Sequence, residues 1–465
     1  MGREIIDENE IIDLINRSER PDKNKARGLL QKSLQLKGLL PSEAAFLLNI
    51  DDDELLSELF ITAKRIKDEI YGNRLVLFTP LYVSNHCCND CLYCGFRVRN
   101  ENIERRQLTL DEIKEETLAI LEQGHKRILL LMGETPEQDF LDYLIKAVEA
   151  IYSVRDSKGN CIRRINIEIA PLGEEGFERI KHLPIGTYTV FQETYHRETY
   201  AKVHAGGKKR DYDWRLFTMD RALTNGMNDV GIGALFGLYD YRFETIALLE
   251  HSRYLDQTYG VGPHTISVPR LKPAGNAPVS LNTNHQVTDK DFKKLIAVLR
   301  CSVPYTGIIL STREPAGLRT EIFELGVSQI SAGSVVKPGG YKQAIRDESY
   351  EGQFSLNDTR KSGEVIRDII RKGFIPSFCT ACYRLGRVGA DFMDLAKPGL
   401  IKAHCQPNGL LTLKEYLMDY ADEETQKAGN ALIEKELLKI PNHKIREKTK
   451  LNLSKIETGK RDIYF

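Results

Sequence analysis

The feature that most constrains the fold of this chain is a regular alternation of short apolar runs with amphipathic segments between about residues 75 and 335. In one such unit, Thr109 and Glu112 have the spacing of a helix capping box. Gly124 is suited to the end of that helix, and the apolar run Ile128 to Met132 follows it. A continuous apolar run after an amphipathic helix is typical of a strand in a parallel sheet that is buried on both faces.

Eight runs of this kind are predicted as strands, and a helical pattern lies between most neighbours. The predicted strands are 76–83, 127–132, 165–170, 188–192, 229–233, 265–269, 307–311 and 328–332. Eight parallel strands with intervening helices favour a (β/α)8 barrel, an α/β fold of the TIM type, over a doubly wound sheet. Two of the intervening helices are expected at 214–225 and 289–301.

The segments on either side of the repeat have a different character. Residues 1–70 are predicted to form an N-terminal helical extension, because apolar residues such as Leu55, Leu59 and Ile66 recur at helical spacing. The barrel is expected to occupy residues 71–340. Residues 341–363 are polar and loop-like, and they begin a C-terminal domain, 341–465, that ends in a charged helical tail.

Charge and hydropathy exclude several classes of function. Lys plus Arg and Asp plus Glu both number 66, so no positive surplus favours nucleic acid as a partner. No apolar run approaches the roughly 18 residues that span a membrane. The acidic N-terminus lacks the basic-then-apolar order of a signal peptide. We therefore expect a cytoplasmic protein without nucleic-acid or membrane partners.

Nine cysteines in such a compartment are unlikely to form structural disulfides and more often bind metal or act in redox chemistry. Six of them fall into two clusters. The remaining three, Cys88, Cys161 and Cys301, are interpreted as ordinary free cysteines.

The first cluster follows the first predicted strand, where Cys87, Cys91 and Cys94 form a C-x-x-x-C-x-x-C triplet with Tyr93 before the last cysteine. A cubane [4Fe–4S] cluster usually takes four thiolates, so three leave one iron open to a small molecule. On the first loop after a barrel strand, that iron would face the mouth where active sites form. A zinc site completed by His86, or a cluster used only for electron transfer, are the alternatives.

The triplet and the predicted barrel together resemble the radical S-adenosylmethionine (SAM) superfamily. The resemblance implies that the open iron binds the amino and carboxylate groups of SAM, and that one electron then releases a 5′-deoxyadenosyl radical. It assigns cofactor contacts to residues near the ends of strands one, two and four. These are Tyr93, Phe96 against the adenine, Glu134 on the amino group, Gln192 and Glu193 on the ribose or methionine, and Arg215 on the carboxylate. The chain departs from the family at Met132-Gly133, where many members have two glycines.

The second cluster comprises Cys379, Cys382 and Cys405, spaced C-x-x-C-x22-C. A C-x-x-C pair alone suggests a zinc ribbon or a redox pair, and His404 could complete a zinc site. Within a radical SAM enzyme, three cysteines instead indicate an auxiliary [4Fe–4S] cluster with one open corner.

The barrel and both triplets together resemble the radical tyrosine lyases that mature [FeFe]-hydrogenase, and stretches such as FQETYH and GPHTISVPR support this. The resemblance implies hydrogen abstraction from the amino group of L-tyrosine and cleavage to p-cresol and dehydroglycine. Dehydroglycine would yield carbon monoxide and cyanide, captured on an additional iron at the auxiliary cluster as a precursor of the hydrogenase H-cluster.

Three further residues fit this two-site scheme. Arg313, after the seventh strand, can pair bidentately with the substrate carboxylate, and Ser331 can add a hydroxyl contact at the same mouth. The family implies that His264 ligates the additional iron. Since His264 precedes the sixth strand, it belongs to the opposite end, the floor of the barrel. We therefore expect the two clusters to lie roughly 20 Å or more apart, the length of a typical strand.

Competing interpretations remain at this stage. The related 2-iminoacetate synthase of thiamine biosynthesis shares the tyrosine chemistry and the barrel but lacks the C-terminal cysteine motif. A non-catalytic iron–sulfur scaffold would bind clusters without turnover. The expected partners of the leading interpretation are L-tyrosine, a reductant such as ferredoxin or flavodoxin, and other hydrogenase maturases.

Overall fold

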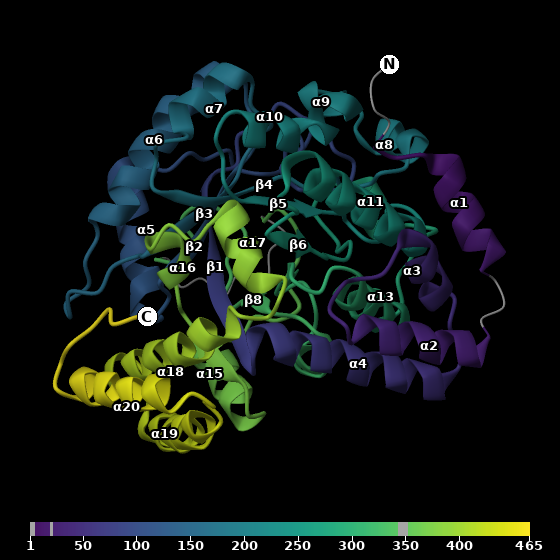
Figure 1. Cartoon of the computed structure of the whole chain (residues 1–465). Helices are drawn as coiled ribbons and strands as arrows, with labels where there is room; N and C mark the ends of the chain where they lie inside the picture. Colours follow the sequence, from purple (N-terminus) through teal and green to yellow (C-terminus); the bar gives the residue numbers. More distant parts are fainter. Residues whose placement is uncertain (1–4, 19–21, 343–351) are drawn as a thin grey trace.

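The computed structural model describes residues 5–18, 22–342 and 352–465, and its centre is a parallel barrel (Figure 1). Strand β1 pairs with both β2 and β8, which closes the ring. The eight barrel strands are β1 (Arg74–Ser84), β2 (Arg127–Met132), β3 (Arg164–Glu168), β4 (Ile185–Thr189), β5 (Val230–Gly233), β6 (Thr265–Ser267), β7 (Gly307–Leu310) and β8 (Gln329–Ser331). The predicted (β/α)8 fold is confirmed.

A ring of helices covers the barrel. These are α5 (Leu110–Glu122), α6 (Glu137–Ser153), α7 (Glu174–Ile180), α8 (Arg197–Val203), α9 (Tyr212–Leu216), α10 (Thr218–Thr224), α11 (Tyr241–Tyr259), α12 (Pro278–Leu281), α13 (Asp289–Ser302) and α14 (Ala316–Ile322). The capping box at Thr109 and Glu112 forms as predicted, and Gly124 follows α5 with a left-handed φ of 88°. Where one helix was expected over 214–225, the chain forms α9 and α10, because Phe217 leaves the helical conformation.

The described residues that precede the barrel form α1 (Glu8–Arg17), α2 (Lys23–Ser33), α3 (Pro41–Leu48) and α4 (Asp53–Tyr71), while the N-terminal extension as a domain of its own stays a prediction. They lie together on one side of the molecule, where α4 packs along α13 and α3 contacts α11 and α13 (Figure 1). None of the helices within the described ranges is long and apolar enough to cross a membrane.

The C-terminal part contains α15 (Ser362–Arg371), β9 (Ile375–Ser377), α16 (Ala381–Arg384), α17 (Gly389–Ala396), α18 (Lys402–Asp419), α19 (Glu423–Leu438) and α20 (His443–Glu457). Strand β9, which the sequence did not reveal, pairs in parallel with the first residues of β1, Arg74 opposite Ile375. Helix α18 packs on β9. The second cysteine triplet is thereby fixed at the amino ends of the barrel strands. The division of the chain at residue 340 stays a prediction.

The described residues between β8 and α15, 332–342 and 352–361, contact loops at the barrel mouth, as in the hydrogen bond from Gly95 N to the Gln353 carbonyl. Residues 343–351, within the loop expected at 341–363, lie outside the described residues. The next part of the loop is anchored by a fully buried ion pair between Arg319 of α14 and Asp358. Arg319 also donates to the Ser331 carbonyl, and Arg360 donates to Asp358. Burial opposes ionisation of Asp358, but the two arginines outweigh it and hold the pKa of Asp358 below its usual value.

Replacing Asp358 by Asn should therefore destabilise the protein, because it leaves the buried Arg319 charge without its partner. Breaking one side of a buried pair costs about 3–5 kcal/mol. The matched control is Asp368→Asn, which removes the partly exposed partner of Arg360 and should cost about 0–1 kcal/mol. Thermal unfolding followed by circular dichroism would compare them, and equal melting temperatures would contradict this role of the pair.

Candidate functional site

The first cysteine triplet lies on a loop at the carboxyl end of β1. Backbone hydrogen bonds fix this loop on two sides. Cys88 N donates to the Glu134 carbonyl at 2.9 Å, and Leu92 N donates to the Val203 carbonyl at 2.9 Å. The loop is thus held against the ends of β2 and α8, at the barrel mouth.

The three thiols of this loop are close enough to influence one another electrostatically. Burial raises the pKa of Cys87 to about 12 and raises the pKa of Cys91 and Cys94 as well, and neighbouring thiols add to the effect at Cys87 and Cys91. Such thiols ionise only when a positive partner binds them, and iron is such a partner. The donor set fits a [4Fe–4S] cluster with one open corner.

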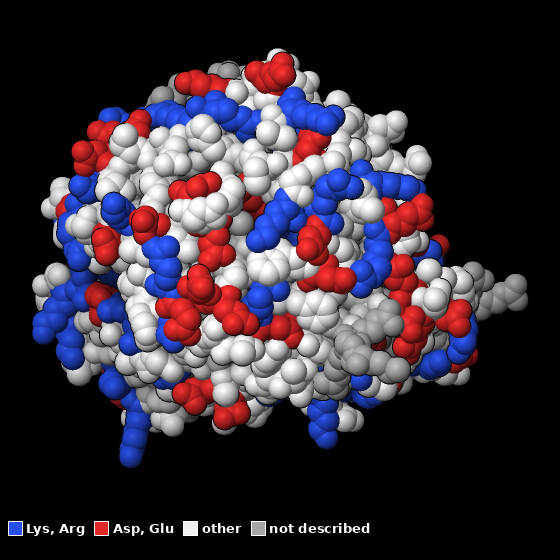
Figure 2. All heavy atoms as spheres, turned by 90° about the horizontal axis from the view of Figure 1, so that it is seen from above, with Lys and Arg blue, Asp and Glu red and all other residues white. Residues whose placement is uncertain are grey.

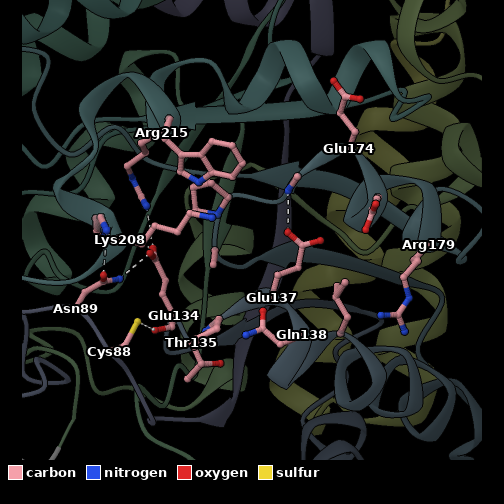
Figure 3. Close-up of a pocket in the computed structure, with 18 residues that line it drawn as sticks. Cys88, Asn89, Glu134, Thr135, Glu137, Gln138, Glu174, Arg179, Lys208 and Arg215 are labelled. Atoms are coloured by element: carbon pink, nitrogen blue, oxygen red, sulfur yellow. Dashed lines mark hydrogen bonds and ion pairs between the residues drawn. The ribbon is translucent and has the colours of Figure 1, made fainter.

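Charged side chains surround the expected cofactor position beside this loop. Glu134 accepts hydrogen bonds from Arg215 at 2.9 Å and from Asn89 at 2.8 Å, and Lys209 pairs with Glu193 at 2.7 Å. Figure 3 shows Glu134 between Asn89 and Arg215. Burial opposes the charge on Glu134, but Arg215 and Lys209 outweigh it and hold its pKa below the usual value.

Glu193 occupies a strained backbone position. Its φ is 71°, a left-handed conformation that a residue with a Cβ rarely adopts. The adjacent Gln192 is buried and donates to the Tyr212 carbonyl at 3.4 Å. A strained residue whose carboxylate pairs with a buried lysine indicates a position shaped for binding.

Beside Glu134 lies a cavity of about 690 Å³ that opens between the loops after β2 and β3 (Figure 3). Its walls combine acidic groups, Glu137 and Glu174, with the cationic Lys208. Lys208 and Arg221 flank the Trp214 ring, 4.0 and 3.8 Å from its centroid. The cavity therefore gives solvent access to the Glu134–Arg215 pair.

The two aromatic residues of the first cluster have defined partners. The Tyr93 hydroxyl hydrogen-bonds with His204 Nε2 at 2.9 Å, and Phe96 packs edge-to-face on Tyr82 with 5.8 Å between ring centroids. Both rings are buried beside the cysteines. They shape the loop, and their predicted contact with the cofactor stays a prediction.

Arg313 and Ser331 lie at the same mouth, at the ends of β7 and β8. Arg313 is stacked over the Phe354 ring at 3.3 Å and makes one long hydrogen bond, 3.5 Å, to the Arg270 carbonyl. Ser331 Oγ accepts from Thr312 N at 3.2 Å. Among the described residues, most donors of the Arg313 guanidinium therefore have no partner and are available for a bound anion.

The second triplet lies at the other end of the barrel. Arg74, the first residue of β1, donates to Cys405 Sγ at 3.0 Å, and Arg127, the first residue of β2, donates weakly to the Cys379 carbonyl at 3.4 Å. Burial raises the pKa of Cys382 to about 12, and Cys405 and Cys379 add to this effect. The three thiols gather at the barrel floor.

His264, immediately before β6, lies at this floor. Its Nδ1 is 3.7 Å from Asp229, and its ring lies 4.6 Å from that of Phe392 on α17. Burial lowers the pKa of His264 to about 4, and the nearby Arg164, Arg127 and Arg74 act in the same direction. The ring is therefore a neutral imidazole near pH 7.

Four nitrogens at the floor are buried without a hydrogen-bond partner in the described part of the chain. They are the Nε atoms of Arg74, Arg127 and Arg387, and His264 Nδ1. Orphaned cationic donors around three thiols are what an anionic iron–sulfur cluster and its ligands would satisfy. The floor thus fits an auxiliary cluster, with His264 as a nitrogen donor beside it.

His404, the candidate fourth ligand of a zinc site, instead has its Nδ1 3.4 Å from Arg387 Nη1. Within the described ranges, no group of three or more His, Cys, Asp or Glu side chains is arranged to hold a single metal ion.

Sequence reasoning missed several residues of both sites. Asn89, Lys209 and His204 bind Glu134, Glu193 and Tyr93 at the mouth. Arg74, Arg127, Arg164 and Asp229 surround the floor. A charged residue at or just before the start of an apolar run, repeated on β1, β2, β3 and β5, was a readable signal for the second group.

Comparisons with known proteins agree with this arrangement. The Radical SAM superfamily domain matches residues 81–251, and the Biotin and Thiamin Synthesis associated domain matches residues 267–375. The crystal structure of HydG, a maturase of the [FeFe]-hydrogenase, is 47% identical, with a TM-score of 0.95 over 100% of both chains. The HydG structure from Carboxydothermus hydrogenoformans is 44% identical, with a TM-score of 0.82 over 96% of this chain and 100% of that one. The 2-iminoacetate synthase of Escherichia coli (strain K12) is 33% identical over 75% of this chain and 89% of its own length.

Iron analysis of anaerobically reconstituted protein tests both donor sets. Two cubane clusters require about eight irons per chain and no zinc. Cys91→Ser and the double variant Cys379→Ser/Cys382→Ser should each lose about four. Cys88→Ser is the matched control, because Cys88 is exposed beside Cys87 and should keep the full iron content. Stoichiometric zinc in the wild type would contradict the auxiliary cluster.

Proposed function

Because the chain belongs to the HydG family of [FeFe]-hydrogenase maturases within the radical SAM superfamily, we propose that it cleaves L-tyrosine to p-cresol and dehydroglycine. We propose further that dehydroglycine is converted to carbon monoxide and cyanide at an auxiliary cluster with an additional iron. Membership of the family makes the protein an enzyme that uses SAM and a [4Fe–4S] cluster. The carbon–carbon lyase activity and the second cluster are the proposal.

The observation that carries the proposal is the placement of the two cysteine triplets at opposite ends of one barrel. Strand β1 has 11 residues, with Arg74 beside Cys405 at its start and the first triplet after its end. At about 3.3 Å per residue, its ends lie roughly 30 Å apart. Two clusters at this separation serve two reactions joined by a diffusing intermediate.

At the mouth, the bound cofactor and cluster supply a carbon-centred radical that can remove a hydrogen atom from a substrate. The chain's own groups hold the reactants. In this proposal Glu134 would bind the cofactor amino group and Arg215 its carboxylate, while Gln192 and Glu193 would bind the ribose or methionine. Arg313, most of whose donors have no partner in the described part of the chain, would clamp the tyrosine carboxylate.

The interior between the two ends carries polar side chains where such barrels usually hold branched apolar ones. Arg164 donates to Asn166 Oδ1 at 2.8 Å and to Thr187 Oγ1 at 3.0 Å. Two glycines let these polar side chains approach the backbone closely, since a Cβ on Gly231 would meet the Thr265 hydroxyl at 2.6 Å and one on Gly307 would meet Gln329 Nε2 at 2.6 Å. These polar groups would offer hydrogen bonds to a small polar intermediate such as dehydroglycine.

At the floor, His264 would ligate the additional iron and Cys379, Cys382 and Cys405 would hold the auxiliary cluster. The orphaned donors of Arg74, Arg127 and Arg387 provide positive charge for anions such as cyanide. The expected partners are L-tyrosine, a one-electron reductant such as ferredoxin or flavodoxin, and the maturases that receive the product.

The second candidate is 2-iminoacetate synthesis, which the 33% identity to the Escherichia coli enzyme favours. The reaction at the barrel mouth would be the same, but the product would leave the protein without reacting further at the floor. That reaction requires no cluster or anion at the floor and so does not explain the arginines around the second triplet. We therefore prefer the two-site function.

The two functions separate in one assay of reconstituted protein with SAM, tyrosine and dithionite. We expect p-cresol, carbon monoxide and cyanide from the wild type. Cys87→Ala should abolish all three, whereas Cys379→Ala/Cys382→Ala should keep p-cresol and lose carbon monoxide. Unchanged carbon monoxide in the double variant would show that the floor is not catalytic, and absence of p-cresol from the wild type would refute the lyase.

Arg313→Lys tests the carboxylate clamp. Lysine keeps the charge but cannot form the bidentate pair, whose loss costs about 1.5–3 kcal/mol as for other hydrogen bonds to charged groups. The KM for tyrosine should rise about 10-fold or more in the p-cresol assay, with SAM binding unchanged. A normal KM would remove Arg313 from the substrate site.

A further inference from the structure

One carboxylate at the barrel mouth has no part in the scheme so far. Glu168 is the last residue of β3, between Leu131 of β2 and Thr189 of β4. Side chains two apart on a strand share a face, so Glu168 points the same way as Arg164 and Asn166. Arg164 contacts Thr187 and Asp229 in the barrel interior, so Glu168 faces the interior too, at its mouth.

The other carboxylates here are already paired. Glu134 accepts from Arg215 and Asn89, and Glu193 pairs with Lys209. Among the residues that the structure describes, none forms a hydrogen bond or ion pair with the Glu168 carboxylate, which stays partly accessible.

The charged and titratable groups that face Glu168 come from four elements around the mouth: Glu193 after β4, Lys209 and Arg215 before and within α9, Arg313 after β7, and Tyr82 on β1. Burial raises the pKa of Glu168 to about 7, and the negative Glu193 adds to the increase. The three cations oppose it. Glu168 can therefore both take up and release a proton near neutral pH.

Glu168 and Arg313 lie within electrostatic range of each other. An α-amino acid carries its ammonium and carboxylate groups on one carbon, so a substrate clamped by Arg313 would hold its ammonium nearby. A hydrogen atom leaves a neutral amine far more readily than an ammonium, because an ammonium nitrogen would become a radical cation. The reaction therefore needs a base at this position.

We propose that Glu168 is that base and accepts the proton that the tyrosine ammonium must lose before its nitrogen gives up a hydrogen atom, a role that rests on the lyase function above. The N–H bonding pair stays on nitrogen as a lone pair, and the proton passes to a Glu168 oxygen. The carboxyl group so formed returns the proton to solvent before the next turnover, so the step needs no oxidant or reductant.

The test uses the reconstituted full chain and initial rates of p-cresol formation at varied tyrosine concentration, between pH 6 and 9. Glu168→Gln should lower kcat about 10²–10⁴-fold, the usual contribution of a general base, with the KM for tyrosine changed only a few-fold. Wild-type kcat/KM should rise as the pH passes upward through about 7, because only the ionised carboxylate accepts a proton. Glu168→Asp should keep this rise, and Glu168→Gln should lose it.

The matched control is Glu178→Gln, which removes an exposed carboxylate from α7 and should leave the rate and pH profile unchanged. Loss of folding would not explain the defect. The pKa of Glu168 is higher in the folded than in the unfolded protein, so ionisation of this group destabilises the fold. The destabilisation increases from about pH 4.5 to 7 and stays constant at higher pH. Glu168→Gln removes it, so this variant should melt at or above the wild-type temperature at pH 8.

Three results would overturn the proposal while leaving the lyase function standing: a Glu168→Gln kcat within about threefold of a wild type that makes p-cresol, a defect that saturating tyrosine fully reverses, or weakened SAM binding with the normal pH profile. The second would mean that Glu168 only binds the ammonium group, and the third that it holds the cofactor. If the wild type makes no p-cresol, the lyase function fails and the proposal with it.

Discussion

The structure depends above all on the closure of eight parallel strands, in which β1 pairs with both β2 and β8. Closure gives the barrel two ends that differ chemically, because every strand runs in the same direction. Residues that follow strands gather at the mouth, and residues that begin them gather at the floor. Since β1 spans the whole distance, its two ends position both cysteine triplets, one directly through the next loop and the other through Arg74 and β9.

The charged side chains are arranged differently at the two ends of the barrel. At the mouth, acidic and basic groups alternate and mostly neutralise one another, as in the Glu134–Arg215 and Lys209–Glu193 pairs. At the floor, arginines surround thiols, and three of their Nε atoms have no hydrogen-bond partner within the described ranges. The mouth is thus prepared for zwitterionic ligands and the floor for an anionic group. The face of the molecule in Figure 2 shows neither bias, since Lys and Arg are interspersed with Asp and Glu across it.

Much of the fold was readable in advance, and the differences have local causes. The strand positions and the closed barrel followed from apolar runs and capping signals, because buried parallel strands need continuous hydrophobicity. Strand β9 was missed because three residues, one of them Pro376, carry no strand pattern. The break between α9 and α10 at Phe217 was missed because both halves keep one helical periodicity.

The sequence by itself determined the chemistry of the donor sets, because cysteines a few residues apart lie close together in any fold. It also placed His264 at the start of a strand. Only the tertiary structure decided which groups accompany them. Arg74, Arg127, Arg164 and Asp229 are far apart in the chain and meet His264 only because closure brings the strand starts together. Only the tertiary structure likewise distinguishes Glu168, because nothing in the sequence sets it apart from other acidic residues. Its carboxylate has no hydrogen-bond or ion-pair partner among the residues that the structure describes, and it comes within electrostatic range of Arg313 only because β3 and β7 face one interior.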